Sequence, residues 1–134
     1  MIGIIVTGHG KFASGIADAV KIIDGKPECF VAVDYLLEDN IDTLEEKLND
    51  AIDSLSECKE GIIIFSDITD GAPYKCSARI AKERKETIKA ICGVNLGMLA
   101  ETTTARSMIK NLTSLSTMAL NIGKDQVMQF VDED

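Results

Sequence analysis

The chain has 134 residues, of which 46% are hydrophobic and 27% are charged, and these values favour one globular domain over residues 1–134. Its formal net charge is −8, with no Lys/Arg cluster able to neutralise phosphates, which argues against general nucleic-acid binding. No apolar run approaches the roughly 18 residues of a membrane span and no signal peptide is recognisable, so a cytoplasmic protein is expected.

The chain opens with an apolar run, 2–7, that is rich in Ile and Val and bounded by glycines, which predicts a strand buried on both faces. The segment 14–26 then has helical spacing, and Gly25 marks the end of the predicted helix. A shared apolar face is typical of such a helix. Its members are Ile16, Ala19, Val20 and Ile23.

The middle of the chain repeats this alternation. Strands are predicted at 29–35 and at 61–66, the second of them buried. Between them, 40–55 is the clearest helical pattern in the chain, and acidic residues crowd its first turns, where they suit the helix dipole. The turn-like sequence "DITDGA" follows the third strand, and Pro73 fits the first turn of a helix over 73–85.

The last part of the chain predicts a fourth strand at 87–95, helices over 96–110 and 113–123, and a short final strand at 126–131. Strands that alternate with helices indicate βαβ units. We therefore predict an α/β fold with an open, mostly parallel sheet and helices on both faces. The final strand follows two helices, so it need not run parallel to the others.

Four cysteines occur, at positions 29, 58, 76 and 92, and they form no Cys-x-x-Cys pair and no cluster with histidine. We expect reduced, packed thiols rather than a metal site. Nothing in the sequence indicates a metal ion or another cofactor. The P-loop, the Rossmann glycine motif and the nucleophile elbow of hydrolases are also missing.

Two ionisable residues follow strands whose ends are predicted to meet. His9 is the only histidine and lies between two glycines after the first strand, and Asp67 follows the third strand. In an open α/β sheet, sites gather at the carboxyl ends of the strands, where the strand order reverses. If the order is 2-1-3-4, the first and third strands are neighbours there, and His9 and Asp67 face each other across the crevice.

This pairing suits phosphoryl transfer. One ring nitrogen of an imidazole can carry a phosphoryl group, while a carboxylate that accepts a hydrogen bond from the other nitrogen fixes the tautomer. Helix N-termini after both loops would direct N–H groups at the phosphoryl oxygens. Small residues, Gly8 among them, leave room for a partner's active site. The candidates for contact with the phosphoryl group are Gly10, Gly71 and Ala72. A polar loop residue at position 9 and a helix cap at position 67 are the alternatives.

Three segments together resemble the enzyme IIA domain of the mannose-type bacterial phosphotransferase system (PTS). They are "GHGKFASGI", "IIIFSDITDGAPY" and "ICGVNLGMLAET", in the family's order and across nearly the whole chain. The resemblance implies that His9 is phosphorylated by the carrier protein HPr, that Asp67 orients it, and that phosphate leaves to a IIB component. The sugar then enters through the membrane components IIC and IID. It also implies a homodimer in which the final strand is exchanged and pairs antiparallel with the partner's sheet.

Positions 69–72 depart from the better-known members of this family. They read Thr-Asp-Gly-Ala where those members have an aromatic residue, Gly, Gly and Ser. Ala72 lacks a hydroxyl that could cap the helix, and Asp70 brings a second carboxylate near a future dianion. We expect Asp70 to point outward, toward a basic partner surface. Phe12 is either a core contact of the first helix or an apolar contact for the partner.

Two other functions stay open. The phosphocarrier subunit of the phosphoenolpyruvate-dependent dihydroxyacetone kinase shares the fold and the histidine, although its third-strand loop usually reads Asp-x-Gly-Ser-Ala. A regulatory or binding module of the same fold would use His9 without carrying phosphate onward. The presence of both His9 and Asp67 favours the carrier.

Overall fold

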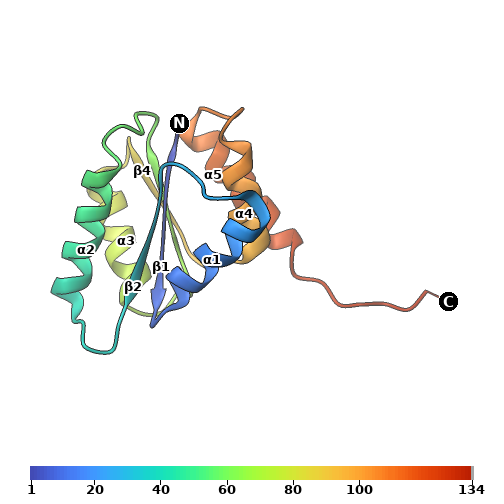
Figure 1. Cartoon of the computed structure of the whole chain (residues 1–134), viewed down its shortest axis with the longest axis horizontal. Helices are drawn as coiled ribbons and strands as arrows, with labels where there is room; N and C mark the ends of the chain where they lie inside the picture. Colours follow the sequence, from blue (N-terminus) through green and yellow to red (C-terminus); the bar gives the residue numbers. More distant parts are fainter. Residues whose placement is uncertain (134) are drawn as a thin grey trace.

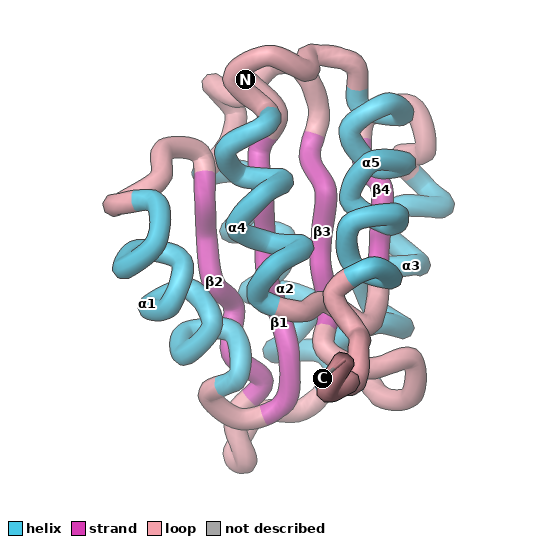
Figure 2. The backbone as a smooth tube through the Cα atoms, turned by 90° about the vertical axis from the view of Figure 1, so that its right-hand side faces the viewer, coloured by secondary structure: helices cyan, strands magenta, loops and turns pink. Residues whose placement is uncertain are grey.

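A computed structural model (Figure 1) describes residues 1–133 and has a four-stranded sheet in the order β2-β1-β3-β4 (Figure 2). Every strand pair is parallel, which confirms the predicted topology. The strands are β1 (Gly3–His9), β2 (Phe30–Tyr35), β3 (Ile62–Ser66) and β4 (Ile88–Ile91). The helices are α1 (Phe12–Asp24), α2 (Ile41–Ser54), α3 (Ala72–Glu83), α4 (Leu96–Ala105) and α5 (Leu112–Asp125).

Helices cover both faces of the sheet, as predicted. Helices α1, α4 and α5 lie on one face and α2 and α3 on the other (Figures 1 and 2). Side chains alternate between the two cores along each strand, so that Val6 and Phe65 face the first core while Ile5 and Ile64 face the second. The chain leaves β1 toward β2 and then crosses to β3 on the other side of β1, so the strand order reverses between β1 and β3.

Local sequence signals place the ends of the helices. The side chain of Asn40 accepts a hydrogen bond from the backbone N–H of Thr43, and the Thr43 hydroxyl accepts one from the backbone N–H of Asn40, which forms a capping box at the start of α2. Gly25, with φ 76°, follows the last residue of α1. Pro73 lies in the first turn of α3, where its missing N–H costs no helical hydrogen bond. No helix within residues 1–133 has the length and apolar character of a membrane span.

The predicted strand at 126–131 is not formed within the single chain. Helix α5 instead continues to Asp125, and the residues after it leave the body of the protein as an extended segment (Figure 1). Val127, Met128 and Phe130 in this segment are each more than four-fifths exposed. An alternating pattern becomes a strand only beside a partner strand, and the described sheet ends at β2 and β4.

The buried face of α1 also differs from the expected one. It runs through Ala13, Ala17 and Val20, at helical spacing, whereas Ile23 is 57% exposed. Ile23 lies at the edge of that stripe in the last turn of the helix. A surface groove forms there between α1 and α4, lined in part by Ile23 and Ala100.

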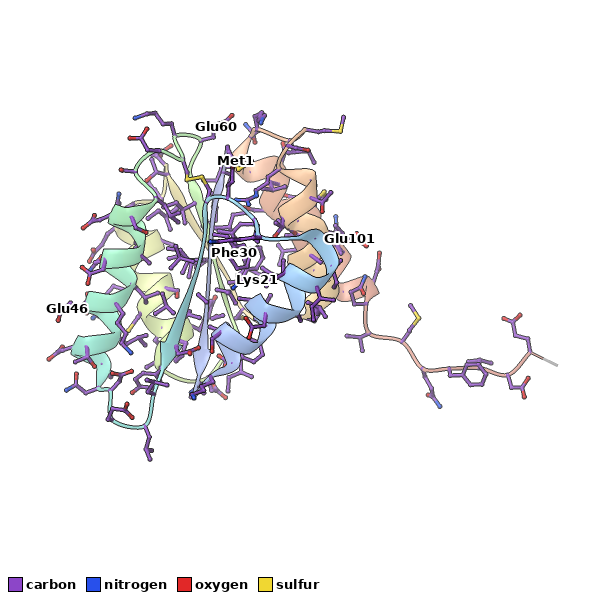
Figure 3. All side chains as sticks on the ribbon, viewed as in Figure 1. Met1, Lys21, Phe30, Glu46, Glu60 and Glu101 are labelled. Carbon is purple, nitrogen blue, oxygen red and sulfur yellow. A yellow bond between two sulfur atoms is a disulfide. The ribbon has the colours of Figure 1, made fainter. Side chains whose placement is uncertain are left out.

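The cysteines are not all reduced thiols, contrary to expectation. Cys29, just before β2, and Cys58, in the loop before β3, form a disulfide, drawn as a yellow bond in Figure 3, whereas Cys76 and Cys92 are free. Their Cα atoms are 6.3 Å apart. The two residues meet because β2 and β3 flank β1 and begin at the same edge of the sheet. This edge lies opposite the one at which His9 ends β1.

Loss of this disulfide should destabilise the protein. The bonded cysteines are 29 positions apart in the sequence. In the chain-entropy description, removal of a crosslink across a loop of that length lowers the free energy of unfolding by about 3.5 kcal/mol, because the unfolded chain gains conformational entropy. Urea unfolding of the oxidised protein and of the double variant Cys29→Ser, Cys58→Ser measures the difference. Equal free energies of unfolding would contradict the crosslink.

Candidate functional site

His9 and Asp67 lie together at the carboxyl edge of the sheet, where β1 and β3 are neighbours. Atom Oδ2 of Asp67 accepts a hydrogen bond from the backbone N–H of His9 at 2.9 Å and lies 2.8 Å from Nδ1 of the His9 ring. Atom Oδ1 accepts a hydrogen bond from the backbone N–H of Ile68 at 2.9 Å. The structure thus brings together the two residues that the strand order placed across the crevice.

The ionisation of Asp67 determines which ring nitrogen of His9 carries the proton. Burial is the largest influence on the pKa of Asp67 and raises it, but the hydrogen bonds from His9 and Ile68 together outweigh burial and hold this pKa below its ordinary value. Asp67 is therefore a carboxylate at neutral pH and can only accept hydrogen bonds. The proton of neutral His9 lies on Nδ1, and Nε2 presents its lone pair. The His9 side chain is 45% exposed, so another protein can reach it.

Nε2 of His9 lies against the start of α3. A Cβ atom added to Gly71 would lie 2.7 Å from Nε2 and from Cε1 of the ring. Gly71 has φ 117° and ψ 170°, a conformation that is essentially restricted to glycine. No side chain caps α3, and the early N–H groups of a helix have no carbonyl partner within it. The positive end of α3 is thus next to Nε2, which suits a phosphoryl group bound there.

The N-terminus of α1 is already occupied, contrary to the expectation that both helices would face the phosphoryl group. Asp34 in β2 accepts hydrogen bonds from the backbone N–H of Ser14 at 2.9 Å and from its hydroxyl at 2.7 Å. The carboxylate takes the place that an anion would occupy at this helix end. Asp34 was not predicted as a functional residue. The available signal was its position near the carboxyl end of a strand, a place that it shares with Asp67.

The two glycines beside His9 serve contacts within the chain. A Cβ atom on Gly8 would lie 2.6 Å from Cδ1 of Phe12 and 3.0 Å from Cγ of Asp67, so Gly8 makes room for these residues rather than for a partner. Gly10 has φ 59°, and its backbone N–H donates to the carbonyl of Tyr35 at 2.7 Å. That N–H is therefore already used and is not free to donate to a phosphoryl group.

The remaining residues that were predicted to belong to the site are Phe12, Asp70 and Ala72. Phe12 is half-buried and packs on the core beneath α1, which supports the first of its two predicted roles. Asp70 is exposed, as expected. Ala72 begins α3 directly after Gly71, so it lies at the helix end that faces Nε2.

Comparisons with known proteins agree on one family. The family model EIIA-man, described as PTS system fructose IIA component, matches residues 3–120. The PTS system fructose-specific EIIA component of Bacillus subtilis is 30% identical over 129 residues, which cover 91% of this chain and 86% of that protein. The PTS system mannose-specific EIIAB component of Escherichia coli K12 is 30% identical over 126 residues, which cover 94% of this chain but 38% of that protein. The chain thus spans well under half the length of such two-part relatives.

A solved structure supports the fold independently. The crystal structure of the phosphotransferase system component EIIA from Streptococcus agalactiae has a TM-score of 0.88 to this chain at 24% sequence identity. The match covers 97% of this chain and 98% of the other.

Proposed function

This chain belongs to the EIIA-man family of PTS components, and from that premise we propose that it carries phosphoryl groups on His9 during sugar uptake. The observation that carries the proposal is the contact between His9 Nδ1 and the Asp67 carboxylate at 2.8 Å, which leaves Nε2 as the nucleophile. The partly exposed ring and the uncapped N-terminus of α3 beside it support the same role.

The transfer step balances without a net proton transfer. The lone pair of His9 Nε2 attacks phosphorus in the phosphohistidine of the donor, and the electron pair of the donor's P–N bond returns to the donor nitrogen. A donor ring that is protonated on its other nitrogen leaves as neutral imidazole. His9 keeps its proton on Nδ1, so its ring becomes a cation once Nε2 bears the phosphoryl group.

Each group of the site has a role in this step. Asp67 stabilises the positive ring through a charge-assisted hydrogen bond. The start of α3, from Gly71 and Ala72, provides positive electrostatic potential for the phosphoryl oxygens. The same arrangement serves the next step, in which a histidine of the acceptor protein attacks the phosphoryl group on His9. The site must therefore be accessible first to the donor protein and then to the acceptor protein.

The partners follow from membership in a phosphotransferase system. We propose the phosphocarrier protein HPr as the donor and a IIB component as the acceptor, with the membrane components IIC and IID acting downstream. Asp70, exposed in the loop after Asp67, would face these partners. The exposed apolar segment after α5 supports a homodimer in which residues 126–131 pair with the sheet of the second copy.

The dihydroxyacetone kinase alternative is not favoured. The matching family model and the relatives that are 30% identical are sugar PTS components. The retained pair of His9 and Asp67 also favours a carrier over a module that binds without being phosphorylated.

A chase experiment tests the carrier function. The protein is labelled with radioactive phosphoenolpyruvate, enzyme I and HPr, and is separated from them. It is then mixed with an unphosphorylated IIB component of a mannose-family system. We expect the label to move to IIB within the mixing time and to stay on the chain when IIB is omitted. Label that stays on the chain with every IIB component of the family would contradict onward transfer.

A further inference from the structure

We propose that residues 36–39, the turn between β2 and α2, form a rigid docking element for the protein that delivers the phosphoryl group, with Leu37 as its apolar anchor. This inference rests on the proposed function of His9. Leu37 is fully exposed, although it is a large apolar side chain. It lines a pocket of about 350 Å³ together with His9, Gly10 and Tyr35.

The 36–39 turn is attached to the loop that carries His9. His9 and Tyr35 are register partners at the ends of β1 and β2. The backbone N–H of Gly10 donates to the carbonyl of Tyr35 at 2.7 Å, and the rings of His9 and Tyr35 meet edge to face with centroids 6.0 Å apart. A protein that brings its phosphorylated residue to His9 therefore also meets Leu37.

The turn is held in shape without the help of Leu37. Oδ2 of Asp39 accepts a hydrogen bond from the backbone N–H of Leu36 at 2.8 Å and a second from Nζ of Lys47 at 2.6 Å. The backbone N–H of Asp39 donates to the carbonyl of Leu36 at 3.0 Å. The hydrogen bond from Lys47 is the main cause of a lowered pKa of Asp39, so this carboxylate is ionised at neutral pH. A turn that is ordered before binding loses little conformational entropy when a partner docks.

The chemistry around His9 describes the partner. Ile68, which follows Asp67 on the other side of the ring, is 53% exposed, so apolar surface flanks His9 on two sides. Glu38 and Asp70 are exposed carboxylates that form no ion pair within residues 1–133, whereas Lys11 is an exposed cation beside Gly10. The complementary partner has an apolar patch next to its phosphorylated residue and basic side chains around that patch.

Two phosphoryl donors separate docking from chemistry. Phospho-HPr needs a protein interface, whereas phosphoramidate is a small molecule that phosphorylates imidazoles directly. For Leu37→Ala we expect kcat/KM with phospho-HPr to fall about 10-fold, mainly through a higher KM. The rate with phosphoramidate should not change. Met108→Ala is the control, because Met108 is 86% exposed in the turn after α4, which runs from the carboxyl edge toward the opposite edge.

Each outcome decides the matter. An unchanged kcat/KM of Leu37→Ala with phospho-HPr would overturn the docking element. So would an equal loss with phosphoramidate, because the substitution would then act on the site itself. An effect on transfer to IIB but not from phospho-HPr would overturn the choice of partner. Wild-type protein that accepts phosphate from phosphoramidate but never from phospho-HPr would refute the proposed donor, and the docking element with it.

Discussion

Replacement of Asp67 by Asn should lower the rate of phosphoryl transfer to His9 by up to about 10⁴-fold, the loss seen when the carboxylate that orients the histidine of a Ser-His-Asp triad becomes an amide. Both oxygens of Asp67 accept hydrogen bonds from N–H groups, two from His9 and one from Ile68. An amide must place its NH₂ group against one of these donors. If it faces His9, the ring takes the other tautomer and Nε2 is no longer a nucleophile. If the NH₂ group faces Ile68, the phosphorylated His9 ring, which is a cation, is no longer stabilised by a negative carboxylate.

The measurement is the rate of phosphorylation by phosphoramidate, which needs no docking. Asp53→Asn is the control, because Asp53 is an exposed carboxylate near the end of α2, away from His9. We expect Asp53→Asn to react like the wild type. Asp67→Asn with a wild-type rate would show that the carboxylate does not set the state of the imidazole.

The Asp67→Asn variant should also change how the free energy of unfolding depends on pH. The lowered pKa of Asp67 means that the folded state favours the carboxylate, so this stabilisation is present above the unfolded pKa of about 3.9. It is lost as the pH falls through the lower folded value. The part of the free energy of unfolding that comes from the ionised Asp67 carboxylate should therefore be lost only below about pH 4, and Asp67→Asn should lack this acid-dependent loss. A loss that already begins at neutral pH would contradict a low pKa for Asp67.

Replacement of Gly71 by Ala should abolish phosphorylation of His9 and also destabilise the protein. The new Cβ atom would meet Nε2 and Cε1 of the ring at 2.7 Å, at the nitrogen that must attack phosphorus. The backbone conformation at this position adds a cost of about 1–3 kcal/mol for a residue with a side chain. Displacement of a reacting group by about 1 Å can cost 100-fold in rate, so the loss of phosphorylation should be large.

Gly25→Ala separates the two effects. Gly25 has φ 76° and ψ −174°, a similarly restricted backbone, but no atom within 4 Å of an added Cβ. We expect Gly25→Ala to lower the free energy of unfolding as Gly71→Ala does, and to accept phosphate like the wild type. Intact mass after incubation with phosphoramidate and urea unfolding provide the two readings. Normal phosphorylation of Gly71→Ala would show that the ring does not need this close approach.

The contact between His9 and Asp67 was predictable because it follows from topology. The carboxyl ends of adjacent parallel strands meet at one edge, where His9 is the last residue of β1 and Asp67 directly follows β3. The alternation of strands and helices predicted the mostly parallel sheet, and the structure has the order β2-β1-β3-β4 that the pairing of His9 with Asp67 requires. Gly25 and Pro73 marked helix ends correctly because their effects on the backbone are local.

The features that were missed depend on contacts between distant segments. The disulfide between Cys29 and Cys58 requires the register of three strands, which no spacing encodes. Asp34 occupies the N-terminus of α1 only because the sheet places β2 beside that helix. Buried Arg106 likewise donates to the carbonyls of Ile2 and Cys29, which lie far away in the sequence.

The most direct test of the account is the intact mass of the protein after incubation with phosphoenolpyruvate, enzyme I and HPr. Wild type should gain one phosphoryl group, about 80 Da, in a form that is labile in acid and stable in alkali. His9→Asn should gain none, because Asn can keep an N–H near the position of Nδ1 for Asp67 but has no nucleophile in place of Nε2. An unmodified wild type, with HPr shown to be active on another acceptor, or the same gain in His9→Asn, would contradict the assignment of His9 as the phosphoryl carrier.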